Sequence, residues 1–112
     1  MEPYDQASEA IILHLVKADE SIQNMHIKKN VFSNKDFSKY SLGNVIFESC
    51  SLEKTKLKQT NHIDMNYIAT DLREADLEAS DLERINILNC QLIKSNFSHS
   101  RVMDAMLSKS KI

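Results

Sequence analysis

An apolar residue occupies nearly every fifth position of this 112-residue chain from Ile22 to Ile112, and His62 is the one exception among nineteen positions. Five residues turn an α-helix by about 140°, so these side chains would scatter around a helix. In a flat strand, successive members of the column would change faces. Two positions earlier the residues are small or apolar, as at Ala75, Ser80, Cys90, Ser95, Ser100, Ala105 and Ser110. The period therefore predicts a solenoid in which a short unit repeats.

The repeat unit resembles that of the pentapeptide-repeat family: a small residue, Asp or Asn, Leu or Phe, and two variable polar residues. Residues 70–74, 75–79, 80–84 and 95–99 match it best. The resemblance covers residues 20–112 and implies a right-handed quadrilateral β-helix with four pentapeptides per coil. We therefore expect an all-β solenoid of about four to five coils over 20–112, with adjacent coils about 4.8 Å apart.

Residues 3–18 have the pattern of an amphipathic helix, with an apolar stripe that includes Tyr4, Ile11 and Leu15. A solenoid must cover its first coil, so we expect residues 1–19 to form a short N-terminal capping helix. A dimerising helix is the alternative. At the other end, Ile112 still occupies a core position. Either the chain is truncated there or a partner covers the last coil.

Composition predicts a protein without catalytic or cofactor chemistry. The net charge is −2, and neither a signal peptide nor a transmembrane stretch is visible. Cys50 and Cys90 fall in the small inward position two coils apart, beyond disulfide reach, which favours free thiols and a cytoplasmic location. The resemblance adds a bacterial-type source. No nucleophile–base pair or metal-binding spacing emerges, so we expect no enzyme activity, cofactor, metal, membrane or nucleic-acid partner.

Two apolar surfaces are candidate interfaces. Outward positions on one face of the solenoid hold four apolar side chains, here called the lateral patch: Ile46, Ile68, Leu88 and Met106. Ile63, Met103 and Ile93 would extend it, and ordinary surface variation is the other interpretation. The second candidate is the interface of the last coil, formed by Phe97, Val102, Leu107 and Ile112. The resemblance implies that such coils pair end to end.

Two further features have structural interpretations. One face is wholly polar, where Lys56 should lie above Asp76 and Lys58 above Glu78 as exposed ion pairs. Residues 60–69 are the weakest repeats, because His62 replaces the central apolar residue. We expect a distorted coil or an inward histidine with satisfied hydrogen bonds there, in preference to a ligand site.

The resemblance also implies an alternative function, a DNA mimic that binds a type II topoisomerase (gyrase), as quinolone-resistance proteins do. The chain has a group of acids, here called the acidic belt: Asp71, Glu74, Asp76, Glu78, Asp81 and Glu83. However, residues 21–60 hold seven lysines against three acids, and residues 91–112 hold four bases against one acid. A duplex is negative along its whole axis. We therefore favour a non-enzymatic module that binds another protein or its own copy, most simply as a homodimer.

Overall fold

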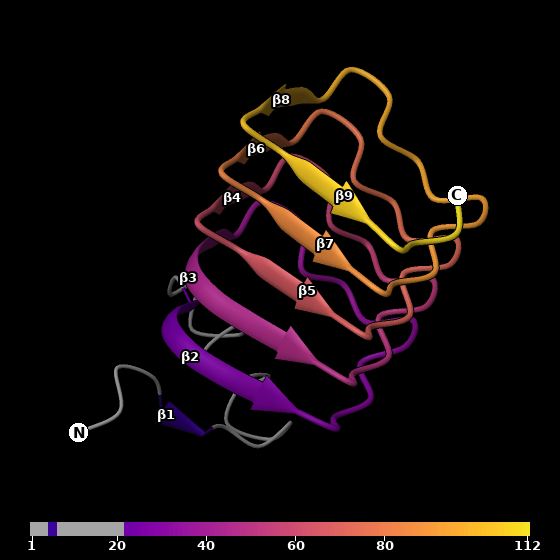
Figure 1. Ribbon diagram of the computed structural model, residues 1–112. Coiled ribbons are helices and arrows are strands. Elements are labelled where there is room, and N and C mark those ends of the chain that lie inside the picture. Colours follow the sequence, from indigo (N-terminus) through magenta and orange to yellow (C-terminus); the bar gives the residue numbers. More distant parts are fainter. Residues whose placement is uncertain (1–4, 7–21) are drawn as a thin grey trace.

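The computed structural model describes residues 5–6 and 22–112, and over these residues the chain is a parallel β-solenoid of about four turns (Figure 1). The described part contains no helix. The strands are β1 (Asp5–Gln6), β2 (Ile22–Lys28), β3 (Ser41–Glu48), β4 (Asn61–Ile63), β5 (Asn66–Ile68), β6 (Asp81–Glu83), β7 (Asn86–Leu88), β8 (Arg101–Met103) and β9 (Met106–Ser108).

Each coil is twenty residues long. Ile27 of β2 lies opposite Phe47 of β3, which lies opposite Tyr67 of β5. The same offset continues through β7 to Leu107 of β9. Strand β3 bends around a corner and pairs with both β4 and β5, so the sheet order is β8-β6-β4-β3-β5-β7-β9. Four pentapeptides per coil, and the all-β solenoid predicted from the five-residue period, are confirmed.

Two sides of each coil are strands and the other two are turns. The strand sides are formed by β4, β6 and β8 and by β5, β7 and β9 (Figure 1). On the turn sides, the Thr55 amide donates to the Leu52 carbonyl at 3.2 Å, and neighbouring coils meet through single bridges such as Ser51 with Asp71. Backbone groups that find no partner within a coil therefore bond to the coil above or below.

The corners explain why the period is five. Eighteen residues, at every fifth position from Asn24 to Lys109, have positive φ angles between 48° and 70°. This left-handed region is unfavourable for residues with a Cβ and worst for β-branched ones. None of the eighteen is glycine, and none is Val, Ile or Thr. Asn24, Asn34, Asn44 and Asn89 are the residue type that tolerates this conformation best after glycine.

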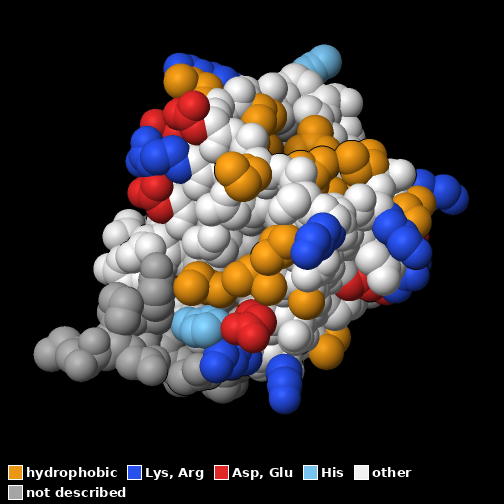
Figure 2. Space-filling view, viewed as in Figure 1, with side chains coloured by type: hydrophobic (Ala, Val, Ile, Leu, Met, Phe, Trp, Pro, Cys, Tyr) orange, Lys and Arg blue, Asp and Glu red, His pale blue; other side chains and the backbone are white. Residues whose placement is uncertain are grey.

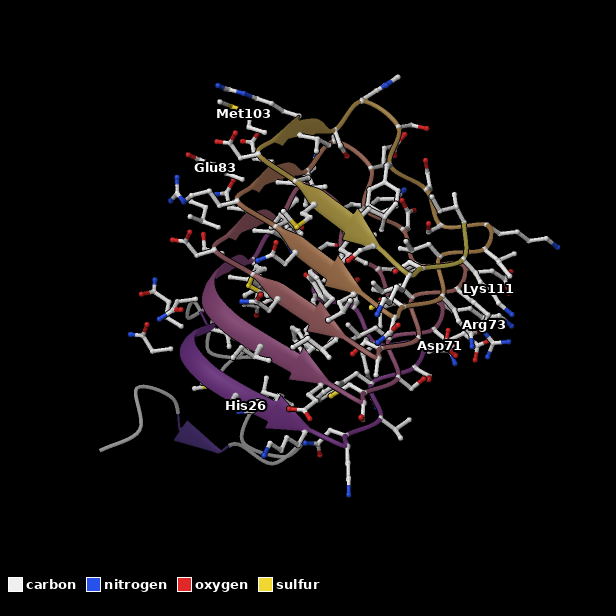
Figure 3. The ribbon with its side chains drawn as sticks, in the orientation of Figure 1. His26, Asp71, Arg73, Glu83, Met103 and Lys111 are labelled. Carbon is white, nitrogen blue, oxygen red and sulfur yellow. The ribbon has the colours of Figure 1, made fainter. Side chains whose placement is uncertain are left out.

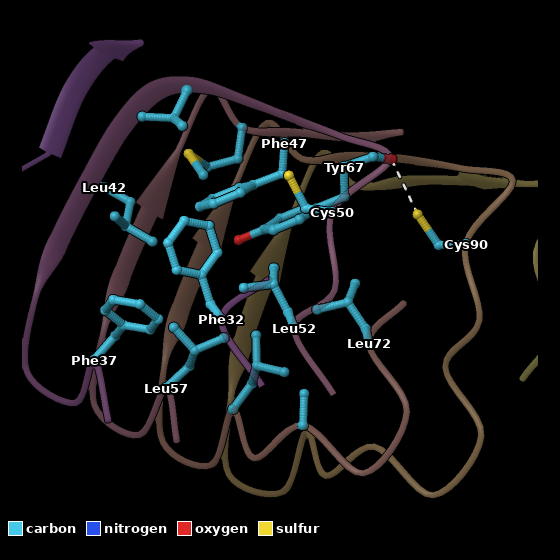
Figure 4. Packing of buried hydrophobic residues seen from close by; sticks show 14 of the residues in the cluster. Phe32, Phe37, Leu42, Phe47, Cys50, Leu52, Leu57, Tyr67, Leu72 and Cys90 are labelled. Atoms are coloured by element: carbon cyan, nitrogen blue, oxygen red, sulfur yellow. Dashed lines mark hydrogen bonds between the residues drawn. The ribbon is translucent and has the colours of Figure 1, made fainter. Parts of the chain in front are cut away.

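The two inward columns fill the solenoid. Its first coils hold aromatic side chains: the rings of Phe32 and Phe37 meet edge to face at 5.8 Å, and Phe47 stacks on Tyr67 at 5.6 Å (Figure 4). Small inward residues such as Ala75 are fully buried, as predicted. A void of about 10 Å³ lies among these side chains, which is room for one water at most. Each buried leucine or phenylalanine contributes roughly 1.5–3 kcal/mol.

The N-terminal segment departs from its predicted structure where it is described. Asp5 and Gln6 form β1, which pairs in parallel with Met25 and His26 of β2. The prediction of a helix is therefore wrong at Asp5 and Gln6, which form a strand. As a strand, these residues bond to backbone groups along the otherwise open edge of β2. The rest of the predicted 1–19 cap lies outside the described residues.

Candidate interaction site

The last coil, residues 93–112, exposes its inward column. Val102 is 52% exposed, Leu107 45% and Ile112 83%, whereas Leu82 in the preceding coil is 5% exposed. Phe97 is half-buried against the core. These are the four side chains of the predicted C-terminal coil interface, and they project at one end of the solenoid. No further coil stacks on them among the described residues.

A hollow of about 340 Å³ opens between these side chains. Its floor comes from the coil below, through Leu82, Ile85 and Leu92, and its walls come from the last coil, through Val102 and Leu107. Lys94 and Ser95 are its polar members. Figure 2 shows hydrophobic side chains gathered in the upper half of the view, over β9. The end of the solenoid is thus an apolar, concave surface, the shape that a protein partner can fill.

The same end carries an open strand edge. In lower coils the amides of the inward residues donate upward, as Leu72 does to the Gln91 carbonyl at 2.8 Å and Leu92 to the Lys111 carbonyl at 2.7 Å. Val102 in β8 and Leu107 in β9 are the inward residues of the last coil, stacked on Leu82 and Ile87. Among the described residues, no carbonyl lies above their amides to accept a hydrogen bond. Unpaired edges of this kind pair readily with another chain.

The lateral patch is not continuous. Ile68 and Leu88 are register partners on β5 and β7, so their side chains are adjacent, as the column spacing predicts. Ile46 lies opposite Asn66, and Met106 lies opposite Asn86. The two asparagines bond to each other, with Asn86 Nδ2 donating to Asn66 Oδ1 at 3.1 Å. The structure therefore separates Ile46 from Met106 by a polar ladder.

The extensions of the lateral patch are also interrupted. Ile63 and Met103 belong to one outward column, but Glu83 of β6 lies between them. Figure 3 shows Glu83 and Met103 on neighbouring coils along this side of the solenoid. Ile93 is 42% exposed and follows Leu92 on a turn side of the coil. Apart from the adjacent Ile68 and Leu88, the exposed apolar side chains on the sides of the solenoid are scattered, whereas those of the last coil meet around one hollow.

Most of the acidic belt is paired within the molecule. Asp71 binds Arg73 with its Oδ2 atom 2.7 Å from the guanidinium Nη2 (Figure 3), and this hydrogen bond lowers the pKa of Asp71. Glu83 lies 2.7 Å from Arg84. Lys58 Nζ lies 3.6 Å from Glu78, as predicted.

The base nearest to Asp76 is Lys58, at 3.5 Å, and not the predicted Lys56, which stacks on Asp76 through the backbone. The remaining two belt acids, Glu74 and Asp81, have no salt bridge among the described residues.

His62 points inward and its ring is fully buried. Its Nδ1 atom lies 2.6 Å from the Tyr67 hydroxyl and its Nε2 atom 2.5 Å from Thr60 Oγ1. Thr60 Oγ1 donates to the Leu57 carbonyl, so it accepts from Nε2–H, and Tyr67 then donates to Nδ1. Register partners Leu42 and Leu82 lie below and above the histidine without a bulge. Of the two predicted alternatives, the structure shows the satisfied inward histidine.

Burial controls the ionisation of this interior. Desolvation lowers the pKa of His62 to about 3 and raises the pKa of Tyr67. Cys50 and Cys90 are free and buried, and desolvation raises the pKa of both thiols. Each thiol donates to backbone carbonyls, as Cys90 does to Tyr67 O at 3.2 Å. These cysteines therefore act as small packing residues of low reactivity.

The sequence matches a family model at the position of the best repeats. Residues 70–108 match the model described as pentapeptide repeats, in eight copies. Residues 70–108 are pentapeptide repeats. No protein among the curated sequences matches it.

Solved pentapeptide-repeat structures share the fold. Rfr23 from the cyanobacterium Cyanothece 51142 is 20% identical with a TM-score of 0.76, and the match covers 81% of this chain and 63% of that one. HetL from the cyanobacterium Nostoc, involved in heterocyst differentiation regulation, is 15% identical with a TM-score of 0.69, covering 94% and 48%. QnrB1, a plasmid-mediated fluoroquinolone resistance protein, is 20% identical with a TM-score of 0.55, covering 82% and 45%.

At these identities the similarity establishes the fold alone, and the chain spans less than two thirds of each of these three proteins. Within the part of the chain that the structure describes, no helix is long and apolar enough to cross a membrane. No cluster of three or more His, Cys, Asp or Glu side chains suited to a metal ion occurs among the same residues.

Proposed function

We propose that this chain is a non-enzymatic interaction module that binds a second copy of itself through the C-terminal coil. The observation that carries the proposal is the apolar hollow between Leu92, Val102 and Leu107. Free buried thiols are consistent with a reducing compartment, so a cytoplasmic location is part of the proposal.

The energetics of the solenoid support an interface at this end. In the coil below, Leu82 and Leu92 are buried by the residues stacked on them, and each contributes roughly 1.5–3 kcal/mol. Val102, Leu107 and Ile112 leave the same kind of apolar area in water. A second chain that covers these side chains would bury their apolar area, and pairing with the edges of β8 and β9 would add backbone hydrogen bonds.

The lateral patch supports an interface less well, because Asn66 and Asn86 divide it. Its continuous part is the pair Ile68 and Leu88, which are both half-buried already. Two half-buried side chains are ordinary for a soluble surface.

The alternative, a gyrase-binding DNA mimic, has less support. The similarity to QnrB1 is one of fold. Asp71, Asp76, Glu78 and Glu83 already hold bases of the same molecule, so much of the acidic charge is neutralised locally. A duplex mimic needs uncompensated negative charge along its length.

Light scattering over a wide range of concentrations tests the proposal. We expect the unaltered chain to associate, and Ile112→Glu to weaken association by placing a charge on the apolar surface. Val31→Glu is the matched control, because Val31 is 59% exposed on the first complete coil. Leu88→Glu tests the lateral patch. A chain that stays monomeric at all concentrations contradicts the proposal, and so does association that Leu88→Glu abolishes and Ile112→Glu leaves intact.

A further inference from the structure

The C-terminal coil that forms the hollow carries a net positive charge. Residues 91–112 contain one acid, Asp104, and four bases. The bases are all exposed, and none forms a salt bridge with another described residue: Lys94, Arg101, Lys109 and Lys111. Lys94 lines the hollow itself. The hollow is therefore apolar with one lysine in its lining, and the coil that forms it is positive overall.

This charge restricts how two copies can meet. Two C-terminal coils placed face to face would oppose four bases with four bases, and like charges across an interface are unfavourable. The complementary surface must be acidic and must also supply apolar side chains. Most of the acidic belt is already engaged, because Asp71, Asp76, Glu78 and Glu83 hold bases of their own molecule.

The first twenty residues of the chain have the complementary chemistry. They contain one base, Lys17, against five acids: Glu2, Asp5, Glu9, Asp19 and Glu20. They also contain the longest apolar run of the sequence, residues 10–16, which His14 interrupts. Strand β1, within this segment, pairs with β2 at the opposite end of the solenoid from β9 (Figure 1). A head-to-tail neighbour would thus bring this end to the C-terminal coil.

We propose that the acidic N-terminal segment of one copy, residues 1–20, binds the hollow of the positively charged C-terminal coil of the next copy. The inference rests on the proposed function, because it requires that coil to be an interface with a second copy. The contact is heterologous, so association continues beyond a dimer unless the copies close into a ring. Exposed charges take part in it, so salt weakens it.

Sedimentation velocity on charge-reversal variants tests the inference. The first variant is Glu2→Lys/Glu9→Lys, compared with the unaltered chain at about 20 mM and about 500 mM NaCl. The matched control is Glu74→Lys/Asp81→Lys, which reverses two exposed belt acids that have no salt bridge among the described residues. We expect the first variant to raise the Kd of self-association at least about tenfold at low salt, and the control to change it less than about twofold.

A second pair of variants tests the direction of the contact. Lys109→Glu/Lys111→Glu should also weaken self-association, because its C-terminal coil then repels the acidic segment. Mixing it with Glu2→Lys/Glu9→Lys should restore pairwise association, because the unaltered basic coil of one variant can then meet the unaltered acidic segment of the other. Circular dichroism confirms that each variant keeps the β-solenoid.

The outcomes separate this inference from the proposed function. If the unaltered chain associates and Glu2→Lys/Glu9→Lys associates equally well, the head-to-tail contact is wrong and the C-terminal interface stands. A dimer that grows no further as concentration rises, and that responds to Lys109→Glu/Lys111→Glu alone, leads to the same conclusion. If the unaltered chain is monomeric at every concentration, both are wrong.

Discussion

The coil around Leu72 and the coil around Leu107 are built from the same repeat, yet their environments differ. Around Leu72, the inward residues Leu77 and Ala75 are also buried, and the backbone bonds to coils above and below. In the last coil the corresponding Leu107 and Ala105 are exposed. A solenoid residue therefore owes much of its burial to the coil stacked on its own.

The largest expected difference is between two identical truncations. Leu72→Ala removes a fully buried side chain and should lower the free energy of unfolding by about 2–5 kcal/mol. Leu107→Ala, at a concentration where the chain is monomeric, should lower it by less than about 1 kcal/mol, because the leucine is already hydrated. Urea denaturation measures both values. Equal losses would mean that the two coils are equally packed.

The middle of the solenoid should be acid-sensitive because of His62. An unfolded histidine binds a proton below about pH 6.5, whereas folded His62 stays neutral down to about pH 3. Between these values the unfolded state binds more protons, so stability falls as the pH falls, by about 2 kcal/mol from pH 7 to pH 5. Urea denaturation across this range, by circular dichroism, measures the effect.

Two variants control that prediction. His62→Leu/Tyr67→Phe makes the buried pair apolar, so no unpaired hydroxyl remains and the acid-dependent loss should disappear. His99→Gln, which removes an exposed histidine, is the matched control for replacing a histidine. If His62→Leu/Tyr67→Phe loses as much stability in acid as the unaltered chain, His62 is not the sensitive group.

Placing a β-branched residue at a corner of the middle coils should lower the free energy of unfolding by an intermediate amount. Ala79 has a φ of 57° and is exposed, so Ala79→Val adds no core contact and forces a β-branched residue into the left-handed region. We expect a loss of about 1–3 kcal/mol in thermal or urea unfolding. Ala79→Gly is the control and should show no such loss, because glycine adopts this conformation freely. A tolerated valine would contradict the steric account of the corners.

The smallest effect is expected on the polar side. Lys58→Ala removes the salt bridges to Asp76 and Glu78, but all three side chains are partly exposed. Such pairs contribute about 0–1 kcal/mol and less in salt, so unfolding in high salt should be nearly unchanged by the substitution. A loss comparable to that of Leu72→Ala would show that the ion pairs, and not the columns, hold adjacent coils together.

Much of the fold could be predicted from sequence, because each five-residue repeat forms one side of a coil and so determines which residues point inward. Once Ile27, Phe47 and Tyr67 are assigned to one column, the twenty-residue register follows, and with it the contact of Ile68 with Leu88. The corners were not predicted, although the absence of Val, Ile and Thr at every fifth position was a visible signal.

The candidate sites were harder to predict because they depend on side-chain directions. His62 and Tyr67 are five residues apart and both point inward, so their hydrogen bond was within reach of the column argument. The column argument could not predict that Asp76 pairs with Lys58 in place of Lys56, because a flexible lysine side chain can reach an acid in the neighbouring column. The hollow at the last coil also required the positions of its lining residues.

Amide hydrogen exchange at two protein concentrations tests the central claim most directly. The amides of Val102 and Leu107 lie on the open edges of β8 and β9, while the amides of Leu72 and Leu77 are bonded within the solenoid. If the C-terminal coil is an interface, Val102 and Leu107 gain protection as concentration rises, and Leu72 and Leu77 stay protected throughout. Exchange at Val102 and Leu107 that is fast and independent of concentration would contradict the account.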